Sequence, residues 1–546
     1  MRSSLSHLSG LTVDVLVIGA GINGASAAQH LAAAGHDVLL VDKADFGAGA
    51  TARSSRLLHC GLRYLAPGRS ITEFLVRPDR LLTALRMARQ AMAARAELVR
   101  TVPERVTAMR FCFPVYRDGP YRPWQIDAAF GILAGLGSGG RIPLDYERLS
   151  AEVALARPLL RALRDPDRLE AVACFREYQI DWPERLCLDA VLDAERCGAR
   201  VRNYTSAALL GSCPEGWQVR LVDTLGSEPP VHVTARRVLN LAGTGIDAVT
   251  RTVAPDARRR VVGTKGAHLL VRLPPDCAGT GIAALSRRGE PFYCIPWRGL
   301  HFFGPTETLY DGDPHDVRVT PDEAAFLLAE ARHLLPGCHL GPDSVVASWA
   351  GVRPLTYDPA LPLGRRSREL HDLAADGLPG IFALTAGPVM SHRSAGRLLA
   401  RTAARGLVPR RPAQAVRYAG PAVAQDPTRR GQCPGTPCAP AELRRVVERE
   451  HAATLADILF RRMGAAWGEP LGEREIATVA AAVGDALGWD AAARQAAIAA
   501  YTNEVASLFA SPFAVSSPRP PLLVSPAPDP LSIPAGTAAL SQGDRP

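Results

Sequence analysis

The first forty residues pass from a short apolar run through a glycine-rich turn to an alanine-rich segment. Residues 13–18 read VDVLVI, a β-branched run that ends in glycines and predicts a buried strand. Residues 23–35 have the composition of a helix, and residues 37–42, DVLLVD, predict a second buried strand. A strand, a turn, a helix and another strand in this order are typical of the start of a parallel α/β sheet.

The apolar pattern changes farther along the chain. A helix is predicted over 78–101, where leucines recur among many arginines. Between residues 200 and 305 the chain has short apolar runs separated by Gly and Pro, such as WQVRLVD, HVTARRVLNLAG and FYCIPW, which predict strands. A further strand at 380–387 leads into a helical pattern at 391–405.

The C-terminal part of the chain has a different composition. Residues 406–440 are rich in Pro, Gly and Arg and predict a linker. Residues 441–512 have helical periodicity and predict a small all-α domain. Residues 513–546 are rich in Pro and Ser and predict a disordered tail.

Composition limits the class of protein. With 546 residues, 47% apolar and 21% charged, the chain is expected to be globular and to contain several domains. The sequence has no uninterrupted apolar run of about 18 residues, so a membrane-spanning helix is not predicted. The start MRSSLSHLSG does not predict a secretory signal. The eleven cysteines have no paired CxxC spacing, which predicts reduced cytosolic thiols and no metal site.

The formal net charge is +9, and arginine supplies nearly all of the positive charge, since Lys43 and Lys265 are the only lysines. This balance fits an anionic substrate or an anionic membrane surface, and it fits equally a solvated surface with surplus arginine. The basic and aromatic pattern of known nucleic-acid modules does not occur, so no nucleic-acid partner is expected.

The turn after the first strand has the pattern G-x-G-x-x-G. Gly19 allows the tight turn, Gly21 lets the backbone approach a pyrophosphate, and Gly24 lets the helix pack close to the strand. The first N–H groups of the helix are available to the anion. Asp42, at the end of the second strand, is placed to accept hydrogen bonds from a ribose diol. This context predicts a dinucleotide site; the alternative is a turn that only packs the helix on the sheet.

The fingerprint alone does not distinguish FAD from NAD. After the second strand the chain enters FGAGATARSSRLLHCGLRYL, which is dense in hydroxyl groups and does not continue into another βα unit. A flavin cofactor needs hydrogen-bond donors along its ribityl chain, and Thr51, Ser54 and Ser55 supply them. The sequence therefore favours FAD.

From about residue 13 to 510 the chain resembles the FAD-dependent glycerol-3-phosphate dehydrogenases, which belong with the D-amino-acid-oxidase-like flavoproteins. The resemblance rests on VIGAGINGA, SSRLLHCGLRYL, LNLAGTG, KGAHLLV, IPW with FFGPTET, AGVRPL and the helical block around EHAATLADILFRRMG. It implies oxidation of sn-glycerol 3-phosphate to dihydroxyacetone phosphate, with electrons passed through FAD to a quinone. It also implies a cytoplasmic enzyme held peripherally on the inner face of the cell membrane.

The resemblance implies an α/β fold with a glutathione-reductase-like FAD-binding domain, an interleaved antiparallel-sheet substrate domain and a C-terminal all-α domain. The FAD-binding domain is predicted to comprise residues 1–110, 178–262 and 345–405. The substrate domain is predicted to comprise 111–177 and 263–344. A homodimer is a further possibility.

By the same resemblance, particular residues are expected to bind cofactor and substrate. A dianionic phosphate is a natural ligand for arginine, which binds it bidentately, and an arginine near the reacting hydroxyl can stabilise developing alkoxide charge. Substrate-binding residues are Arg63, Tyr64, Arg365 and His392, and catalytic residues are Arg353, His268 and His59. Cofactor-binding residues are Gly19, Ala20, Gly21, Ile22, Asn23, Gly24, Asp42, Lys43, Thr51, Ser54, Ser55, Arg56, Leu57, His59, Gly243, Gly387 and Ser391.

Several of these roles have a plain structural alternative. Arg63 and His59 are alternatively surface or helix-capping groups. His268 has a side chain suited to general base catalysis and is alternatively a satisfied core histidine. Arg365 is followed closely by further arginines, so it is alternatively part of a solvated basic loop.

The chain departs from the family pattern beside the expected substrate. Where the family has Gly-Gly-Lys-Leu-Thr-Thr-Tyr-Arg, this chain has AGPVMSHR at 386–393, so Pro388 replaces a phosphate-binding lysine. Cys60 replaces a glycine, and Pro305 and Glu307 stand where Thr and Asp are usual. Loss of one charge-assisted contact costs about 1.5–3 kcal/mol, or one to two decades in affinity. Either neighbouring arginines compensate, or the substrate differs.

Two other functions remain open at this point. One is an oxygen-using FAD oxidase of another hydroxy or amino acid, and the other is a non-catalytic FAD-binding paralogue. Peripheral attachment to a membrane is expected from the Arg/Leu pattern at 78–101, for which an ordinary amphipathic surface helix is the alternative.

Overall fold

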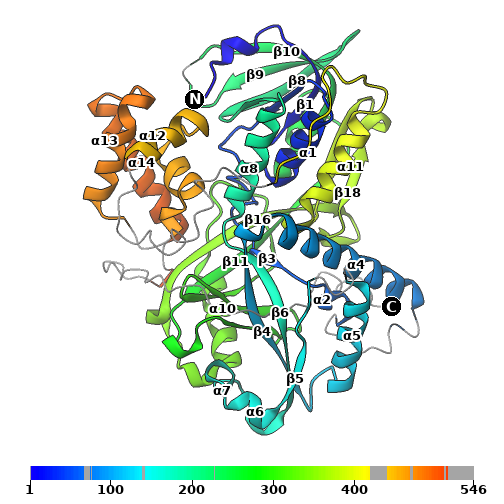
Figure 1. Ribbon diagram of the computed structural model, residues 1–546, viewed down its shortest axis with the longest axis vertical. Helices are drawn as coiled ribbons and strands as arrows, with labels where there is room; N and C mark the ends of the chain where they lie inside the picture. Colours follow the sequence, from blue (N-terminus) through cyan, green and yellow to red (C-terminus); the bar gives the residue numbers. More distant parts are fainter. Residues whose placement is uncertain are drawn as a thin grey trace.

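A mostly parallel sheet around β1 forms the upper half of the computed structural model, which describes residues 2–66, 74, 77–137, 142–226, 228–418, 440–467, 471–509 and 512–513 (Figure 1). Antiparallel β9 and β8 extend this sheet from β10. The strands, in sheet order, are β18 (Glu369–Asp372), β19 (Ile381–Thr385), β10 (Val231–Asn240), β1 (Thr12–Ile18), β2 (Val38–Val41) and β7 (Arg200–Arg202), with β9 (Gly216–Asp223) and β8 (Thr205–Cys213) beside them.

Three helices cover one face of this first sheet: α1 (Ile22–Ala33), α8 (Pro183–Arg196) and α11 (His392–Ala403). Their alanines, leucines and valines share one apolar cluster with side chains of β1 and β2. The other face buries a second cluster against β8 and β9. Because both faces are covered, β1 and β2 are apolar at almost every position, as parallel strands commonly are. The predicted strand–turn–helix–strand unit is confirmed.

A second, mostly antiparallel sheet forms the lower half of the molecule (Figure 1). Two of its long strands, β16 (Val345–Asp358) and β11 (Val261–Val271), extend upward toward the first sheet and so connect the two halves. The strands, in sheet order, are β17 (Leu361–Arg365), β16 (Val345–Asp358), β11 (Val261–Val271), β14 (Leu300–Gly304), β13 (Pro291–Trp297), β12 (Thr280–Leu285), β4 (Val106–Tyr116), β6 (Leu169–Ile180) and β3 (Leu57–Leu58), with β15 (Thr308–Leu309) on β11 and β5 (Glu147–Ser150) on β6.

Helices pack on both faces of the second sheet. One apolar cluster joins it to α2 (Leu62–Leu65), α4 (Pro78–Thr101) and α5 (Pro123–Leu136). The opposite cluster joins it to α6 (Ala151–Leu155), α7 (Pro158–Arg161) and α10 (Pro321–Leu334). The remaining short helices are α9 (Ile246–Arg251), η1 (Leu5–Leu8), η2 (Pro103–Arg105), η3 (Pro166–Arg168), η4 (Gly243–Gly245), η5 (Pro275–Cys277), η6 (Pro336–Cys338), η7 (Pro342–Ser344), η8 (Leu373–Asp376) and η9 (Val389–Ser391).

Helices also make up the C-terminal block, residues 440–467 and 471–509, which lies beside the first sheet (Figure 1). Its apolar side chains join the cluster that contains α4 and α5. The elements are α12 (Pro440–Arg449), a π-helical turn η12 (Asp457–Arg462), η13 (Ala465–Trp467), α13 (Glu473–Leu487) and α14 (Ala491–Phe509). The predicted fold class, with its two sheets and its C-terminal helical part, is thereby confirmed.

The predicted domain limits are not settled by this arrangement. β16 pairs in the second sheet, although residues 345–405 are predicted to belong to the FAD-binding domain. The predicted linker at 406–440 and tail at 513–546 lie mostly outside the described residues. Within the described part of the chain, none of the helices is long and apolar enough to cross a membrane.

The contact between α1 and β1 allows a direct test. A Cβ atom at Gly24 would lie 1.8 Å from the carbonyl oxygen of Gly19, which is fixed backbone. G24A is therefore expected to lower the free energy of unfolding by roughly 3 kcal/mol, the upper end of the range for overpacking, as measured by urea denaturation. G49A is the matched control, because a Cβ there has no heavy atom within 4 Å. Equal stability of the two variants would contradict this packing.

Candidate active site

The glycine-rich turn leaves the start of α1 open to a ligand. Gly19 has φ +102, in the left-handed region that favours glycine, and α1 begins at Ile22. A Cβ at Gly21 would meet only the Thr51 hydroxyl, at 3.4 Å, so the backbone here can be approached closely. The Ile22 N–H donates to the Thr51 hydroxyl at 3.1 Å, which fixes the following loop against the turn.

Asp42 lies against the same turn. Its carboxylate accepts hydrogen bonds from the Ala20 N–H at 2.6 Å and from the Ala44 N–H at 2.9 Å. Burial outweighs these bonds and raises the pKa of Asp42 to about 6. The carboxylate is therefore held beside the turn, at the position where a ribose diol would donate hydrogen bonds to it.

The segment 54–65 crosses from the first sheet to the second. Leu57 and Leu58 form β3, which pairs with Gln179 and Tyr178 of β6, and the Cys60 N–H donates to the Glu177 carboxylate. The Arg56 guanidinium donates to the Asp181 carbonyl oxygen at 2.6 Å and lies 4.8 Å from the centre of the Trp297 ring. The leucines of this segment pack into the core, and most of its polar side chains line a cavity.

This cavity has a volume of about 230 Å³ and lies between the two sheets. It brings together many of the predicted site residues: Ser54, Ser55, Arg56, Leu57, His59, Arg63, His268, Arg353 and Gly387. Sequence reasoning missed several polar residues that also line it, namely Arg53, Glu290, Tyr293, Thr306 and Arg366, and Glu307, noted only as a departure from the family pattern, lines it too.

Arg366, rather than Arg365, lines the cavity. Arg365 ends β17 and forms an ion pair with Asp358 on the largely exposed side of that strand. The next residue, Arg366, follows the end of β17, lines the cavity and pairs with Glu307. Gly364, with φ +75, interrupts the regular alternation of β17, so the sequence pattern does not separate the two arginines. The role predicted for Arg365 stays a prediction, but the structure places it outside the cavity.

Other predicted residues also lie outside this cavity. Tyr64 lies next to it, where its hydroxyl accepts a hydrogen bond from Arg63 at 3.1 Å. His392 is buried at the start of α11, with Nδ1 2.9 Å from the Val389 carbonyl oxygen. Ser391 donates its hydroxyl to the Pro388 carbonyl oxygen at 2.9 Å. The side chain of Lys43 is exposed, and Gly243 begins η4.

The charges that line the cavity do not balance within it. Arg366 is paired with Glu307, but neither Arg63 nor Arg353 has a carboxylate partner among the described residues. Burial, with Arg366 and Arg63 nearby, lowers the pKa of Arg353 to about 10, so it remains cationic at neutral pH. Burial and the neighbouring Glu307 raise the pKa of Glu290, which weakens its ability to neutralise the arginines. The cavity thus favours an anion.

Two buried histidines line the same cavity. His268 has Nε2 3.3 Å from the Ser55 hydroxyl, and its ring stacks on Trp349 with centroids 5.2 Å apart. Burial lowers the pKa of His268 to about 3 and that of His59 well below 6.5. Both ring nitrogens of His59 are buried and lack a partner in the described part of the chain. Both imidazoles are therefore neutral at pH 7 and able to accept hydrogen bonds.

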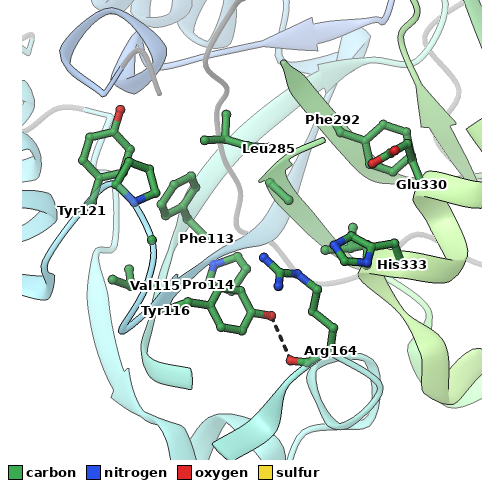
Figure 2. A pocket seen from close by; sticks show the side chains of 14 residues that line it. Phe113, Pro114, Val115, Tyr116, Tyr121, Arg164, Leu285, Phe292, Glu330 and His333 are labelled. Carbon is green, nitrogen blue, oxygen red and sulfur yellow. Dashed lines mark hydrogen bonds between the residues drawn. The ribbon is translucent and has the colours of Figure 1, made fainter. Parts of the chain in front are cut away.

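A smaller cavity of about 70 Å³ lies at β4 and β13 of the second sheet (Figure 2). Aromatic side chains such as Phe113, Tyr121 and Phe292 line it, and the Tyr116 hydroxyl donates to the Arg164 carbonyl oxygen at 3.1 Å. Phe292 points to the opposite side of β13 from its neighbour Tyr293, which lines the larger cavity. None of the predicted site residues lines this smaller cavity.

Residues 14–402 match the model of the family described as FAD dependent oxidoreductase. Glycerol-3-phosphate dehydrogenase of Synechocystis sp. is 29% identical over 398 residues, covering 70% of this chain and 68% of that protein. Aerobic glycerol-3-phosphate dehydrogenase of Staphylococcus haemolyticus is 25% identical over 390 residues, covering 70% of this chain and 65% of that protein. The chain thus spans about two thirds of the length of these relatives.

A solved structure shares the fold over nearly the whole chain. The glycerol-3-phosphate dehydrogenase from Bacillus halodurans, complexed with FAD, has a TM-score of 0.66 at 20% identity. The match covers 92% of this chain and 96% of that one. It therefore includes the C-terminal block as well as the two sheets.

The buried imidazole of His268 predicts a pH dependence of stability. An unfolded histidine titrates near 6.5, whereas burial lowers the pKa of folded His268 to about 3. Between pH 6.5 and 5 the unfolded chain takes up a proton that the folded chain does not, which favours unfolding by up to about 2 kcal/mol at pH 5. In urea denaturation, the free energy of unfolding of H268N should fall less than that of wild type between pH 7 and 5, by up to about 2 kcal/mol. H7N, at an exposed position, should behave as wild type; equal losses in all three proteins would contradict the assignment.

Proposed function

Because this chain belongs to the FAD-dependent oxidoreductase family, with FAD as its cofactor, we propose that it oxidises sn-glycerol 3-phosphate to dihydroxyacetone phosphate and passes the electrons to a quinone. The observation that carries this proposal is the pair of guanidinium groups, Arg63 and Arg353, that line the cavity without a carboxylate partner among the described residues. The names of the relatives in Synechocystis and Staphylococcus support the same substrate.

The residues present fit FAD. The open backbone at Gly21 and the carboxylate of Asp42 suit the pyrophosphate and ribose of the dinucleotide. Ser54 and Ser55 lie on the cavity wall, and the ring nitrogens of His59, which have no partner in the described part of the chain, can bond a polar cofactor. When bound, FAD supplies a hydride acceptor, the N5 atom of its ring.

The protein's own groups would bind and orient the substrate. Arg63 and Arg353 would hold an anionic oxygen by charge-assisted hydrogen bonds, and Arg353 would also stabilise negative charge on the oxygen that loses its proton. The alcohol proton needs an unprotonated acceptor. His268 and His59 are both unprotonated at pH 7, and their lowered pKa values make them weak bases. Holding the reacting carbon close to the acceptor atom would supply the rest of the rate enhancement.

The altered residue Pro388 lines the cavity and places no charge there. Arg53 and Arg366 line the same cavity, so the total of cationic groups does not depend on a lysine at that position. Pro388, together with the acidic side chains of Glu290 and Glu307, supports a second candidate, an oxidase of another hydroxy or amino acid that reduces oxygen. Hydrogen peroxide released during aerobic turnover would favour this second candidate, and reduction of a soluble quinone without peroxide would favour the first.

Substrate binding can be tested at Arg63. R63M removes one charge-assisted contact, so the glycerol 3-phosphate concentration for half-maximal anaerobic bleaching of the flavin should rise about 10- to 100-fold. The bound flavin content should not change. R365M is the matched control, since Arg365 is largely exposed and paired with Asp358, and it should match wild type. If R63M also matched wild type, the proposed role of Arg63 would be wrong.

Exposed apolar side chains on α4 and α5 support attachment to a membrane surface. Leu82 on α4 and Trp124 on α5 are each 63% exposed, and Ile132 is 42% exposed. The helices lie side by side in Figure 1. Arg86 and Arg89 are exposed on the same face of α4 as Leu82, where they suit anionic headgroups. We propose that this surface rests on the inner face of the cell membrane.

Sedimentation with phosphatidylglycerol vesicles at low salt tests this surface. Wild type should sediment with the vesicles, and L82S/W124S should lose most of that binding, because burial of each apolar side chain supplies about 1.5–3 kcal/mol. V408S is the control: Val408 is 77% exposed but lies outside α4 and α5. Wild type that stays in the supernatant, or a double variant that binds as well as V408S, would contradict the proposal.

A further inference from the structure

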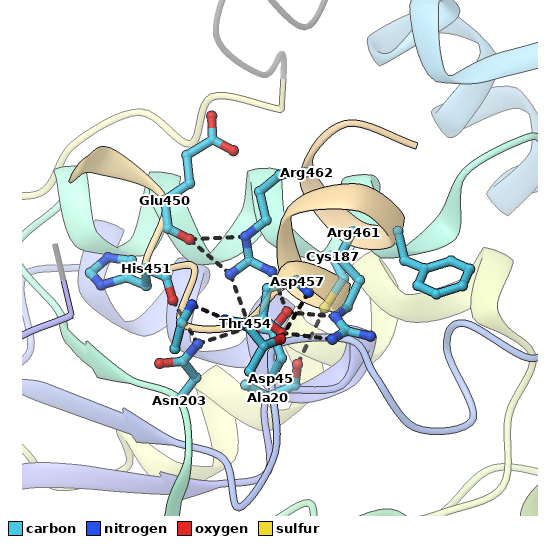
Figure 3. A network of polar contacts seen from close by, with 12 residues as sticks. Ala20, Asp45, Cys187, Asn203, Glu450, His451, Thr454, Asp457, Arg461 and Arg462 are labelled. Carbon is cyan, nitrogen blue, oxygen red and sulfur yellow. Dashed lines mark hydrogen bonds and ion pairs between the residues drawn. The ribbon is translucent and has the colours of Figure 1, made fainter. Parts of the chain in front are cut away.

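The C-terminal block is joined to the first sheet by buried ion pairs that converge on Asp45 (Figure 3). Arg461 Nε donates to the Asp45 carboxylate at 2.6 Å, and Arg462 Nη2 donates to it at 2.9 Å. Asn203 adds a third donor at 2.8 Å. All four side chains are buried. Next to this carboxylate, the rings of Phe46 and His451 meet edge to face with centroids 6.0 Å apart.

Asp45 and Phe46 belong to a loop, residues 42–51, that we call the cofactor loop. Three of its residues bond the glycine-rich turn directly. Asp42 accepts from the Ala20 N–H at 2.6 Å, the Gly47 N–H donates to the Ala20 carbonyl oxygen at 3.0 Å, and Thr51 accepts from the Ile22 N–H. The cofactor loop therefore lies between the C-terminal block on one side and the dinucleotide-binding turn on the other.

We propose that Arg461 and Arg462 are positioning residues for FAD: by fixing Asp45 they hold the cofactor loop in the shape that keeps the dinucleotide bound. The C-terminal block is then a functional part of the cofactor site, although none of its described residues lines the cavity. The inference concerns retention of FAD, so it does not depend on which substrate is oxidised.

The electrostatics of the network support a rigid connection. Burial opposes ionisation of Asp45, but the guanidinium groups of Arg462 and Arg461 outweigh it and hold the pKa of this carboxyl below its usual range. Arg461 also bonds Asp457 at 2.7 Å, and Arg462 bonds the Glu450 carbonyl oxygen at 2.8 Å. Buried charges are costly unless each is paired and hydrogen-bonded. Displacement of Asp45 would remove the one carboxylate that Arg462 pairs with among the described residues, while Arg461 would keep Asp457. The loop is therefore held in one position.

A second buried ion pair joins the same block to α8 and offers a matched control. Arg185 donates to the Glu450 carboxylate at 2.6 Å and to Asp189 at 2.9 Å. Its side chain is as fully buried as that of Arg462, but among the described residues no hydrogen bond or ion pair joins it to the cofactor loop. Neutralising Arg185 and Glu450 together weakens the attachment of the block without touching Asp45.

The test compares two charge-neutral double variants of the full chain, D45N/R462M and R185M/E450Q. Holoenzyme is diluted, and release of FAD is followed by the rise in flavin fluorescence, while circular dichroism gives the unfolding temperature. D45N/R462M is expected to release FAD at least 10-fold faster than wild type. R185M/E450Q is expected to stay within about twofold of wild type, even where the two variants have similar unfolding temperatures.

Equal rates of FAD release from the two double variants, or a wild-type rate from D45N/R462M, would overturn the proposal, because the block would then act only through general stability. If D45N/R462M does not accumulate as folded protein, R462K tests the same contact, since lysine keeps the charge and loses the two-nitrogen fork on Asp45. R445K is its control, because Arg445 pairs with Glu450 and does not reach Asp45. R462K must release FAD faster than R445K.

Discussion

The contact between Gly24 of α1 and the carbonyl oxygen of Gly19 is the constraint on which the rest of the site depends. It brings the first turn of α1 directly behind β1, so that the N–H groups of Ala20 and Ile22 lie at one edge of the sheet. Asp42 and Thr51 accept those two N–H groups and thereby fix the start and the end of the cofactor loop. The chain that leaves this loop crosses to the second sheet, where it forms one wall of the cavity.

The cavity wall carries two kinds of polar side chain. Small hydroxyl groups such as those of Ser54 and Ser55 suit a neutral, hydrogen-bonding cofactor chain. The guanidinium groups include those of Arg63 and Arg353, which form no ion pair with a carboxylate in the described chain. A cofactor bonded to the hydroxyl groups would share the cavity with an anion held by the arginines. This is the arrangement that oxidation of a phosphorylated alcohol needs.

Local patterns in the sequence predict most of the fold. The helix at 78–101 and the strand–turn–helix–strand unit at the N-terminus appear as expected, because their apolar periodicity and glycines report local geometry. Long-range pairs leave no such signal. Arg461 and Asp45 are 416 residues apart, and the sequence around either residue does not indicate that the two form an ion pair. Tyr293 and Arg366 were missed for a related reason: the inward direction of Tyr293 follows from the register of β13 in the second sheet, and that of Arg366 from the irregular end of β17.

The account is tested most directly by comparing sn-glycerol 3-phosphate with compounds that lack the phosphate: glycerol is uncharged, glycerate carries a carboxylate, and glycine has no hydroxyl group. Anaerobic enzyme is mixed separately with sn-glycerol 3-phosphate, glycerol, glycerate and glycine, and the loss of oxidised flavin absorbance is recorded. The guanidinium groups of Arg63 and Arg353, which form no ion pair with a carboxylate among the described residues, predict rapid bleaching by glycerol 3-phosphate and little or none by the other three compounds at the same concentration. Bleaching by glycerate or glycine, with the flavin left oxidised by glycerol 3-phosphate, would contradict the account.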